Sequence, residues 1–447
     1  MARIEKKDKE VVFVPVNKQP YSIPESWRWI SVGAINQYKS NSIDPTKHPE
    51  DMFELYSVPS SAENYPEIVF GQVIGSTKQA VVKGDVLLCK INPRINRVWK
   101  VSQYTDNFLL ASSEWIIIRN HHLNSDYLMY CFRSPFFRDY MLSNVSGVGG
   151  SLMRAQPKYV KEYPIPLPPL AEQQRIVDRI ESLFAKLDEA KEKAQAVVDG
   201  FENRKAAILH KAFVGELTEA QRKKQGICLD SWEFVTLKDI VSGFKYGTSE
   251  KSDYSFTGIP VLRIPNIGDE GIDFSDLKNL SSETIETANQ IHENDILIIR
   301  SNGSRDLVGK CALVPHLDKE YAYASFLIRI KPSERIRADF LVLFLNSADA
   351  RAQMFAKAKS SAGINNINSK ELGAISLRLP ALWEQEEISH QVSKLLLLEK
   401  QAKEVAEQVI DQIDIMKKSI LARAFRGKLG TNNPADESAE ELLKRIL

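Results

Sequence analysis

The sequence has few cysteines and no long apolar run. Its four cysteines are scattered over 447 residues without a CxxC pair, so it lacks the spacing of a zinc knuckle or a redox pair. No apolar stretch reaches the roughly 18 residues that a membrane span needs. The N-terminus, MARIEKKDKE, has no apolar core like that of a secretory signal. Scattered free thiols are typical of a reducing compartment. We therefore expect a cytoplasmic protein without a membrane partner or a metal site.

The sequence also lacks a dominant charge and the common catalytic motifs. A net charge of +1 argues against a uniformly basic coat for nucleic acid, but it permits local basic patches. There is no G-x-x-x-x-G-K-[ST] phosphate loop. A base-methylating motif of the Asn-Pro-Pro-aromatic type is missing as well, because Asn92-Pro93 is followed by Arg94. No glycine-rich cofactor loop and no nuclease-like group of acidic residues with a lysine stands out. We expect no catalytic residue and no cofactor bound by this chain.

What the chain does contain is a long internal duplication. Matching residues recur in the same order at offsets of 205, 210, 212 and 213. Chance matches would not keep a nearly constant offset, so the chain is a tandem repeat. The repeated pairs include Trp27 with Trp232, Gly84-Asp85 with Asn294-Asp295, Ala111-Ser112 with Ala324-Ser325, Glu172-Gln173 with Glu384-Gln385, and Ala212-Phe213 with Ala424-Phe425.

Each half has the same internal order of elements. Roughly 140 residues of mixed character come first, with short β-type runs at 86–89, 115–118, 296–299 and 326–330. Prolines then mark a boundary, at 164, 166, 168 and 169 in the first half and at 380 in the second. Because proline is tolerated only in the first turn of a helix, apolar periodicity after it predicts the start of a long helix.

Both helical segments carry apolar residues at alternating spacings of four and three, which is the a/d seam of a coiled coil. Glu399 breaks the second seam, and the neighbouring Leu398 is expected to compensate. Two independent amphipathic helices are the alternative. Pairing is favoured because both seams have equal length and the same place in the repeat. The first seam runs Ile176, Ile180, Leu183, Leu187, Ala190, Ala194, Val197, Phe201, and the second Ile388, Val392, Leu395, Glu399, Ala402, Ala406, Val409, Ile413.

These patterns predict an α+β fold. It consists of two homologous mixed α/β domains separated by two long coiled-coil helices, arranged as a pseudo-twofold tandem repeat. The expected division is an N-terminal segment 1–20, a first mixed domain 21–165, a central helical spacer 166–225, a second mixed domain 226–377, a distal helical spacer 378–430 and a C-terminal tail 431–447.

Basic and amide-rich loops occur at equivalent places in both halves, after the strands that begin near Asp85 and Asp295 and again before each helix. Arginine and asparagine can make bidentate hydrogen bonds to bases in the major groove, and lysine and arginine bind phosphates. Ordinary turns with solvated charges are the alternative for any single residue, whereas the matched set favours DNA contact. The predicted DNA-binding residues are Lys90, Asn92, Arg94, Asn96, Arg97, Lys100, Ser151, Arg154, Lys245, Arg300, Asn302, Ser304, Arg305, Lys310, Asn365 and Asn366.

Two motifs resemble a known family. The segment 166–176, PLPPLAEQQRI, is similar to the start of the central conserved helix of type I restriction–modification specificity subunits. The segment 419–429, SILARAFRGKL, is similar to the end of their distal helix. The second half departs from the pattern where Ala381-Leu382-Trp383 replaces Pro169-Leu170-Ala171, but the Glu-Gln pair follows in both halves.

The resemblance implies a non-catalytic subunit that reads double-stranded DNA. Each mixed domain would be a target recognition domain for one half of a split, asymmetric target. The helices would set the gap and dock two methylation subunits and, in the full complex, two restriction and translocation subunits. S-adenosylmethionine, magnesium and ATP would then belong to those partners. A seam of 26 residues spans about 39 Å, close to one turn of DNA, which suits antiparallel pairing.

Two other classes of function remain open from the sequence. A stand-alone tandem-domain DNA methyltransferase would need a cofactor loop, and titration with S-adenosylmethionine would reveal one. A coiled-coil adaptor that binds only proteins would explain the helices but not the paired basic loops. Salt-dependent DNA binding would exclude the adaptor, because phosphate contacts release counterions.

Overall fold

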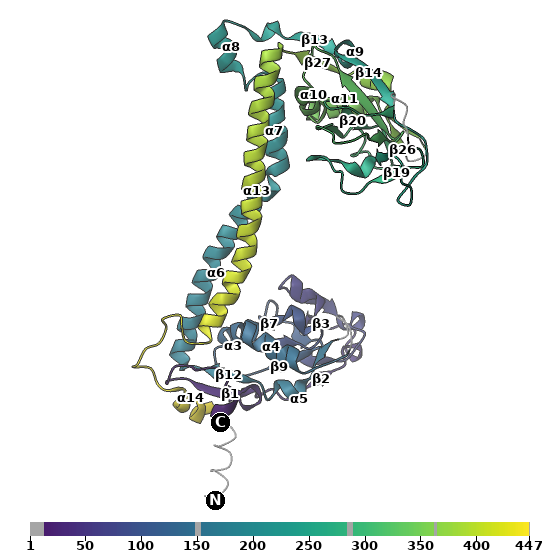
Figure 1. Ribbon diagram of the computed structural model, residues 1–447. Helices are drawn as coiled ribbons and strands as arrows, with labels where there is room; N and C mark the ends of the chain where they lie inside the picture. Colours follow the sequence, from purple (N-terminus) through teal and green to yellow (C-terminus); the bar gives the residue numbers. More distant parts are fainter. Residues whose placement is uncertain (1–12, 148–152, 284–288, 362–363, 447) are drawn as a thin grey trace, which may run out of the picture. The chain divides into compact units, whose positions relative to one another are not determined.

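The computed structural model describes residues 13–147, 153–283, 289–361 and 364–446. The chain divides into two compact units. Unit 1 contains the residues up to Ala194 together with those from Gln408 onward, and unit 2 contains Gln195–Glu407. Each unit therefore holds one mixed domain and parts of both long helices (Figure 1).

In unit 1 a three-stranded sheet, a five-stranded sheet and two strand pairs are joined by short helices. The strands are β1 (Arg28–Ser31), β2 (Ser42–Ile43), β3 (Met52–Tyr56), β4 (Glu67–Phe70), β5 (Lys78–Ala80), β6 (Val86–Cys89), β7 (Val98–Lys100), β8 (Phe108–Ala111), β9 (Trp115–Ile118), β10 (Val145–Ser146), β11 (Arg154–Ala155) and β12 (Pro164–Leu167). The helices are α2 (Val32–Ile35), α3 (Ser125–Arg133), α4 (Pro135–Ser143), α5 (Pro157–Val160), α6 (Leu170–Asp199) and α14 (Ala439–Ile446).

Unit 2 repeats this plan with more short strands. Its strands are β13 (Glu233–Thr236), β14 (Val241–Tyr246), β15 (Ser252–Asp253), β16 (Pro260–Leu262), β17 (Ile267–Gly268), β18 (Gly271–Ile272), β19 (Lys278–Leu280), β20 (Ile296–Ile299), β21 (Ser301–Asn302), β22 (Cys311–Leu313), β23 (Ala322–Tyr323), β24 (Leu327–Pro332), β25 (Lys359–Ser361), β26 (Ile364–Asn366) and β27 (Ser376–Leu379). Its helices are α7 (Phe201–Phe213), α8 (Glu219–Gln225), α9 (Leu237–Ile240), α10 (Ala338–Leu345), α11 (Ala348–Lys357), α12 (Ser369–Gly373) and the first part of α13 (Leu382–Ala424).

The duplication seen in the sequence is a duplication of topology. β1 pairs antiparallel with β12 in unit 1, as β13 does with β27 in unit 2. β6 lies between β7 and β9, and β20 lies between β22 and β24. The predicted strands at 86–89, 115–118 and 296–299 are confirmed, while the strand predicted at 326–330 covers Leu327–Pro332. All four side chains of β6 and of β20 are buried, which explains their continuous apolar runs.

The long helices run antiparallel in each unit. In unit 1, Lys191 lies 2.9 Å from Asp414, and Asp188 is ion-paired with Lys417, so one residue number rises as the other falls. In unit 2, Arg204 lies 2.6 Å from Glu399. The antiparallel arrangement is therefore confirmed. Among the described residues, no helix is long and apolar enough to cross a membrane.

The seam prediction needs three corrections, the first being that Val409 is exposed. Leu398 does not compensate for Glu399, because its side chain is 52% exposed. Glu399 occurs in the seam because Arg204 of the facing helix neutralises it. Ala190 and Ala402 are also exposed, whereas Ala194 and Ala406 are buried. Close approach of the helices is therefore limited to the second alanine of each matched pair.

A buried glutamate joins each helix to its mixed domain. In unit 1, Trp27 Nε1 donates to Glu172 at 2.8 Å and Thr431 Oγ1 donates to the other carboxylate oxygen at 3.1 Å. In unit 2, Trp232 donates to Glu384 in the same way, also at 2.8 Å. The repeated tryptophan and the glutamate of the repeated Glu-Gln pair are therefore hydrogen-bonded to each other in both units.

The C-terminal segment belongs to the core of unit 1. Leu421, Phe425, Leu442 and Leu443 are all buried in the same apolar cluster as Trp27. The end of the second helix therefore covers the first mixed domain. The end of the first helix does the same in unit 2, where Leu209 and Ala212 of α7 pack in the domain core.

Candidate nucleic-acid interface

In unit 1 the structure brings together the two loops that the sequence marked separately. The loop after β6 lies against the segment around β11, because Ile91 forms a β-bridge with Arg154. Asn92 N donates to Met153 O at 2.8 Å, and Ala155 N donates to Lys90 O at 2.8 Å. The two loops that carry the predicted residues therefore lie side by side. Ser151 lies outside the described residues.

Unit 2 makes the same pairing between its two marked loops. Strand β21 pairs antiparallel with β26, so that Asn302 faces Asn365 and Ser301 faces Asn366. Ile367 N donates to Arg300 O at 2.9 Å. Strand β20, which precedes this loop, corresponds to β6 of the first half. Two copies of one loop pair are thus carried on two copies of one sheet.

Left-handed backbone residues give the first loop its shape. Asn92 has φ +46° and Asn96 has φ +52°, a region that asparagine tolerates better than other side chains with a Cβ. They flank the short turn Pro93–Ile95. At the place of Asn96 the second half has Gly309, with φ +86°. Asn96 also donates to Phe132 O at 3.2 Å, so it shapes the loop from both its backbone and its side chain.

A buried ion pair supports the base of each loop. Asp85, 1% exposed, accepts hydrogen bonds from Arg119 at 2.7 and 2.6 Å and from Val82 N at 2.9 Å. In unit 2, Asp295 accepts from His292 N at 2.8 Å and lies 3.7 Å from Arg329. Burial raises the pKa of Asp295 above its usual value. The repeated Asp therefore fixes the strand that carries the loop.

The predicted cations differ in whether a carboxylate neutralises them. Lys100 lies 2.5 Å from Asp126, and Lys310 lies 2.8 Å from Asp269, so both are already neutralised. Arg154 is held by Glu114 at 2.9 Å. Among the described residues, the predicted cations without an ion-pair partner are Lys90, Arg94, Arg97, Lys245, Arg300 and Arg305.

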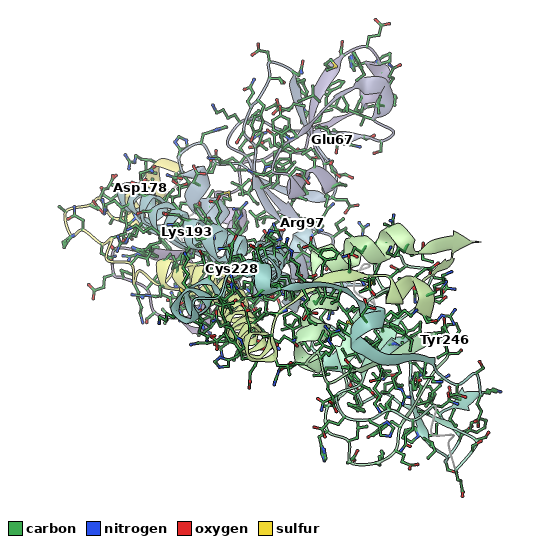
Figure 2. The ribbon with its side chains drawn as sticks, turned by 90° about the horizontal axis from the view of Figure 1, so that it is seen from above. Glu67, Arg97, Asp178, Lys193, Cys228 and Tyr246 are labelled. Carbon is green, nitrogen blue, oxygen red and sulfur yellow. The ribbon has the colours of Figure 1, made fainter. Side chains whose placement is uncertain are left out.

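Among these cations, Arg300 has a guanidinium that is held in place by two neighbouring side chains. Its guanidinium lies 4.6 Å from the centre of the Tyr246 ring, and its Nε donates to Asn366 Oδ1 at 3.3 Å. Its backbone N donates to the carbonyl of Phe326, whose side chain is 56% exposed. Tyr246 (Figure 2) ends strand β14, next to the exposed Lys245. A stacked and hydrogen-bonded arginine loses little entropy when its remaining N–H groups bind a planar acceptor.

The remaining predicted amides and hydroxyls of unit 2 shape the loop. Asn302 Oδ1 accepts from Ser304 N at 2.7 Å, and Asn365 Nδ2 donates to Gly303 O at 3.2 Å. Arg305 lies over the ring of Phe355 at 5.2 Å. Sequence reasoning did not find Tyr246 and Phe326, because an isolated aromatic residue gives no signal until the fold shows that it is exposed beside a cation.

The chemistry that this surface offers is hydrogen-bond donation and positive charge. Lysines, arginines and amides outnumber carboxylates on both loop pairs, and their free N–H groups suit phosphate and base-edge acceptors. Within the described ranges, no group of three or more His, Cys, Asp or Glu side chains could hold a metal ion.

Comparison with known proteins identifies relatives of the whole plan. The family model for the type I restriction modification DNA specificity domain matches twice, at residues 24–198 and 230–408. The chain is 27% identical over 332 residues to the type I restriction enzyme EcoKI specificity subunit of Escherichia coli K12, covering 72% of this chain and 71% of that protein. It is 24% identical over 438 residues to the MjaVIII specificity subunit of Methanocaldococcus jannaschii, covering 92% and 95%.

Two solved structures share the fold. A chain from a type I restriction–modification system, studied for its complex assembly and conformational transition, superposes with a TM-score of 0.72 at 22% identity. The HsdS subunit of Thermoanaerobacter tengcongensis superposes with a TM-score of 0.66 at 21% identity. Each match covers 92% of this chain and 100% of the other. The tandem arrangement predicted from the sequence is thus an established fold.

Proposed function

Because the chain belongs to the type I restriction–modification DNA specificity family, and is thus a non-catalytic specificity subunit, we propose that each mixed domain reads one half of a split, asymmetric DNA target. The two helices would set the number of unread base pairs between the halves. Double-stranded DNA is then the ligand of both loop pairs, and the domains act as two target recognition domains.

The observation that carries this proposal is the repeated loop pair with unequal side chains. The same backbone pairing occurs at Ile91 with Arg154 and at Ser301 with Asn366. The free cations differ: the first loop offers Lys90, Arg94 and Arg97, whereas the second offers Arg300 and Arg305. Identical frames with different donors would read different sequences, which accounts for an asymmetric target.

The test is to assemble the chain with its methylation partner, methylate a library of split targets and sequence the products. Changing Arg300 and Arg305 to alanine should weaken or relax one half-site only. Changing Arg94 and Arg97 to alanine should act on the other half-site only.

The control is Arg335→Ala, because Arg335 belongs to neither loop pair and is ion-paired with Glu233 of β13. It should leave the target unchanged. If both double variants altered the same half-site, the assignment of one half-site to each domain would be wrong.

We further propose that the helices dock two methylation subunits and, in the full complex, two restriction and translocation subunits. S-adenosylmethionine, magnesium and ATP would be bound by those partners. Aliphatic side chains outside the seam support such a contact, since Leu397, Leu398 and Val405 on α13 are all more than half exposed. A pseudo-twofold chain also suits two copies of one partner.

Changing Leu397 and Leu398 to glutamate should reduce the number of methylation subunits bound, as measured by the mass of the assembled complex. Glu404→Gln, at an exposed position of the same helix, is the matched control and should assemble normally. Normal assembly of both variants would place the docking surface elsewhere.

A further inference from the structure

Unit 1 contains a strongly basic cavity beside the first loop pair. The cavity has a volume of about 500 Å³. Its lining includes five basic residues and no acidic one, and we call it the basic pocket. The basic residues are Arg94 and Arg97 of the loop after β6, Arg133 and Arg138 of the corner between α3 and α4, and Lys418 of α13.

The arginines of the corner are held by backbone carbonyls. Arg133 Nη2 donates to Val98 O at 2.9 Å, and Arg138 Nε donates to Arg94 O at 3.0 Å. These bonds orient the guanidinium groups but do not neutralise them. Among the described residues, none of the five cations of the basic pocket takes part in an ion pair.

The second half shows that this charge is not a requirement of the fold. Asn346 stands where the first half has Arg133, and it donates to Cys311 O at 3.1 Å just as Arg133 donates to Val98 O. Lys310, at the place of Arg97, is neutralised by Asp269. Ala206 stands at the place of Lys418, at the offset of 212 that relates the two helices.

One arginine of the basic pocket has an arginine at the equivalent position of the second half, where it makes more contacts. Arg351, at the place of Arg138, donates to the carbonyls of Val308 and Asp306 and lies 4.8 Å from the Phe355 ring. The equivalent corner of unit 2 therefore keeps two cations without an ion pair among the described residues, Arg305 and Arg351, both beside the Phe355 ring, whereas the basic pocket of unit 1 has five.

Like charges gathered in one cavity repel each other, and the repulsion is relieved when an anion enters. Arginines anchored to backbone carbonyls present fixed N–H groups, which suits a phosphate better than a variable base edge. The basic pocket adjoins the loop whose Arg94 and Arg97 (Figure 2 labels Arg97) belong to the DNA surface. The nearest source of phosphate is then the DNA backbone.

We propose that the basic pocket seats one backbone phosphate of the DNA bound by the first domain, with Lys418 of α13 as one of its cations. The proposal rests on the DNA-reading function proposed above. It makes the two halves unequal: the first half-site is held by an additional phosphate contact, which positions the duplex without reading its sequence. It also gives a spacer helix a direct contact with DNA.

The test exchanges residues for those of the second half, in the double variant Arg133→Asn with Lys418→Ala. Asparagine at position 133 can keep the hydrogen bond to the carbonyl of residue 98, as Asn346 does at its own place, so folding should be retained. The matched control is Lys47→Asn with Lys428→Ala, which removes two exposed charges of unit 1 that do not line the basic pocket. Binding of full-length chain to a specific target duplex is measured from 50 to 200 mM salt.

Loss of one phosphate contact should reduce the slope of log K against log salt by about 0.9. The advantage of the unchanged protein over the double variant should therefore shrink about 3.5-fold across that range. The preferred sequence should be the same for both proteins. A neutral methylphosphonate at one backbone position should reproduce the loss in the unchanged protein and have no further effect in the double variant.

Equal slopes for the double variant and the control would overturn the proposal, as would a changed base preference in the double variant. The proposal would also be overturned if the DNA slopes were equal and inorganic phosphate or ATP stabilised the unchanged protein but not the double variant. That result would assign the pocket to a free anion. Absence of any specific DNA binding by the unchanged protein would instead contradict the proposed function.

Discussion

The contact between α13 and the second mixed domain depends on one buried ion pair. Arg222 Nη1 lies 2.5 Å from Glu384 Oε1, and the two side chains are only 5% and 1% exposed. Glu384 also accepts hydrogen bonds from Thr218 and Trp232, at 2.6 and 2.8 Å. We predict that Arg222→Leu destabilises unit 2 by removing one partner of this pair. A buried pair broken in this way costs about 3–5 kcal/mol.

The first half indicates which end of that range to expect. Glu172 holds the equivalent place with donors from Trp27 and Thr431, and the pair that Arg175 makes is with Asp436. The fold therefore tolerates a buried carboxylate with two neutral donors. The expected cost of Arg222→Leu near neutral pH is accordingly about 3 kcal/mol, at the low end of the range.

The loss should depend on pH, as the first half again indicates. Burial raises the pKa of Glu172 above its usual value, with the hydrogen bonds from Trp27 and Thr431 opposing the shift. An acid with a raised pKa in the folded state binds more protons folded than unfolded, so stability falls as pH rises from its unfolded pKa through the folded one. In Arg222→Leu, Glu384 keeps the same kinds of donors, so the destabilisation should shrink as pH is lowered towards 4.5.

Hydrogen exchange of backbone amides is the appropriate assay, because it reports each unit separately in a chain that need not unfold in one step. Amides around residue 384 should lose protection at pH 8 and recover part of it at pH 5, while those around residue 172 match the unchanged protein. The conservative Arg222→Lys should lose less, since it keeps the charge. A destabilisation of equal size at both pH values would refute the reasoning that the uncompensated carboxylate is its cause.

Three further predictions test the architecture. Deleting the facing heptads 190–196 and 408–414 shortens both helices by about 10 Å and should reduce the preferred gap between half-sites by about three base pairs. The gap is measured by methylating a library of targets with variable gaps. An unchanged gap in an active complex would show that the helices do not set it. Asp85→Asn should weaken the pair with Arg119 and destabilise the strand β6 by about 2 kcal/mol, seen as faster exchange of its amides, and unaltered exchange would contradict the supporting role of that pair. The purified chain alone should not consume S-adenosylmethionine, and a radiolabelled transfer assay that detected turnover would contradict its assignment as a non-catalytic subunit.

The sequence by itself determined the tandem plan, most of the central strands and the starts of both long helices. These features are local and periodic, so they can be recognised without a fold. The apolar run 296–299 is a strand with every side chain buried, and Pro380 shortly precedes the helix that begins at Leu382. An internal repeat also needs no structure to be detected, because it compares the chain with itself.

Only the tertiary structure decided which side chains meet. It paired the loop after β6 with the segment at Arg154, gave Glu399 its partner Arg204, and brought Lys418 to a pocket with Arg133. These contacts join residues tens to hundreds of positions apart. Periodicity shows which face of an element is apolar, but the partner of a charged side chain depends on which other element packs against that face. The free or neutralised state of each cation, and with it the difference between the loop pairs of the two halves, is therefore a property of the packed fold.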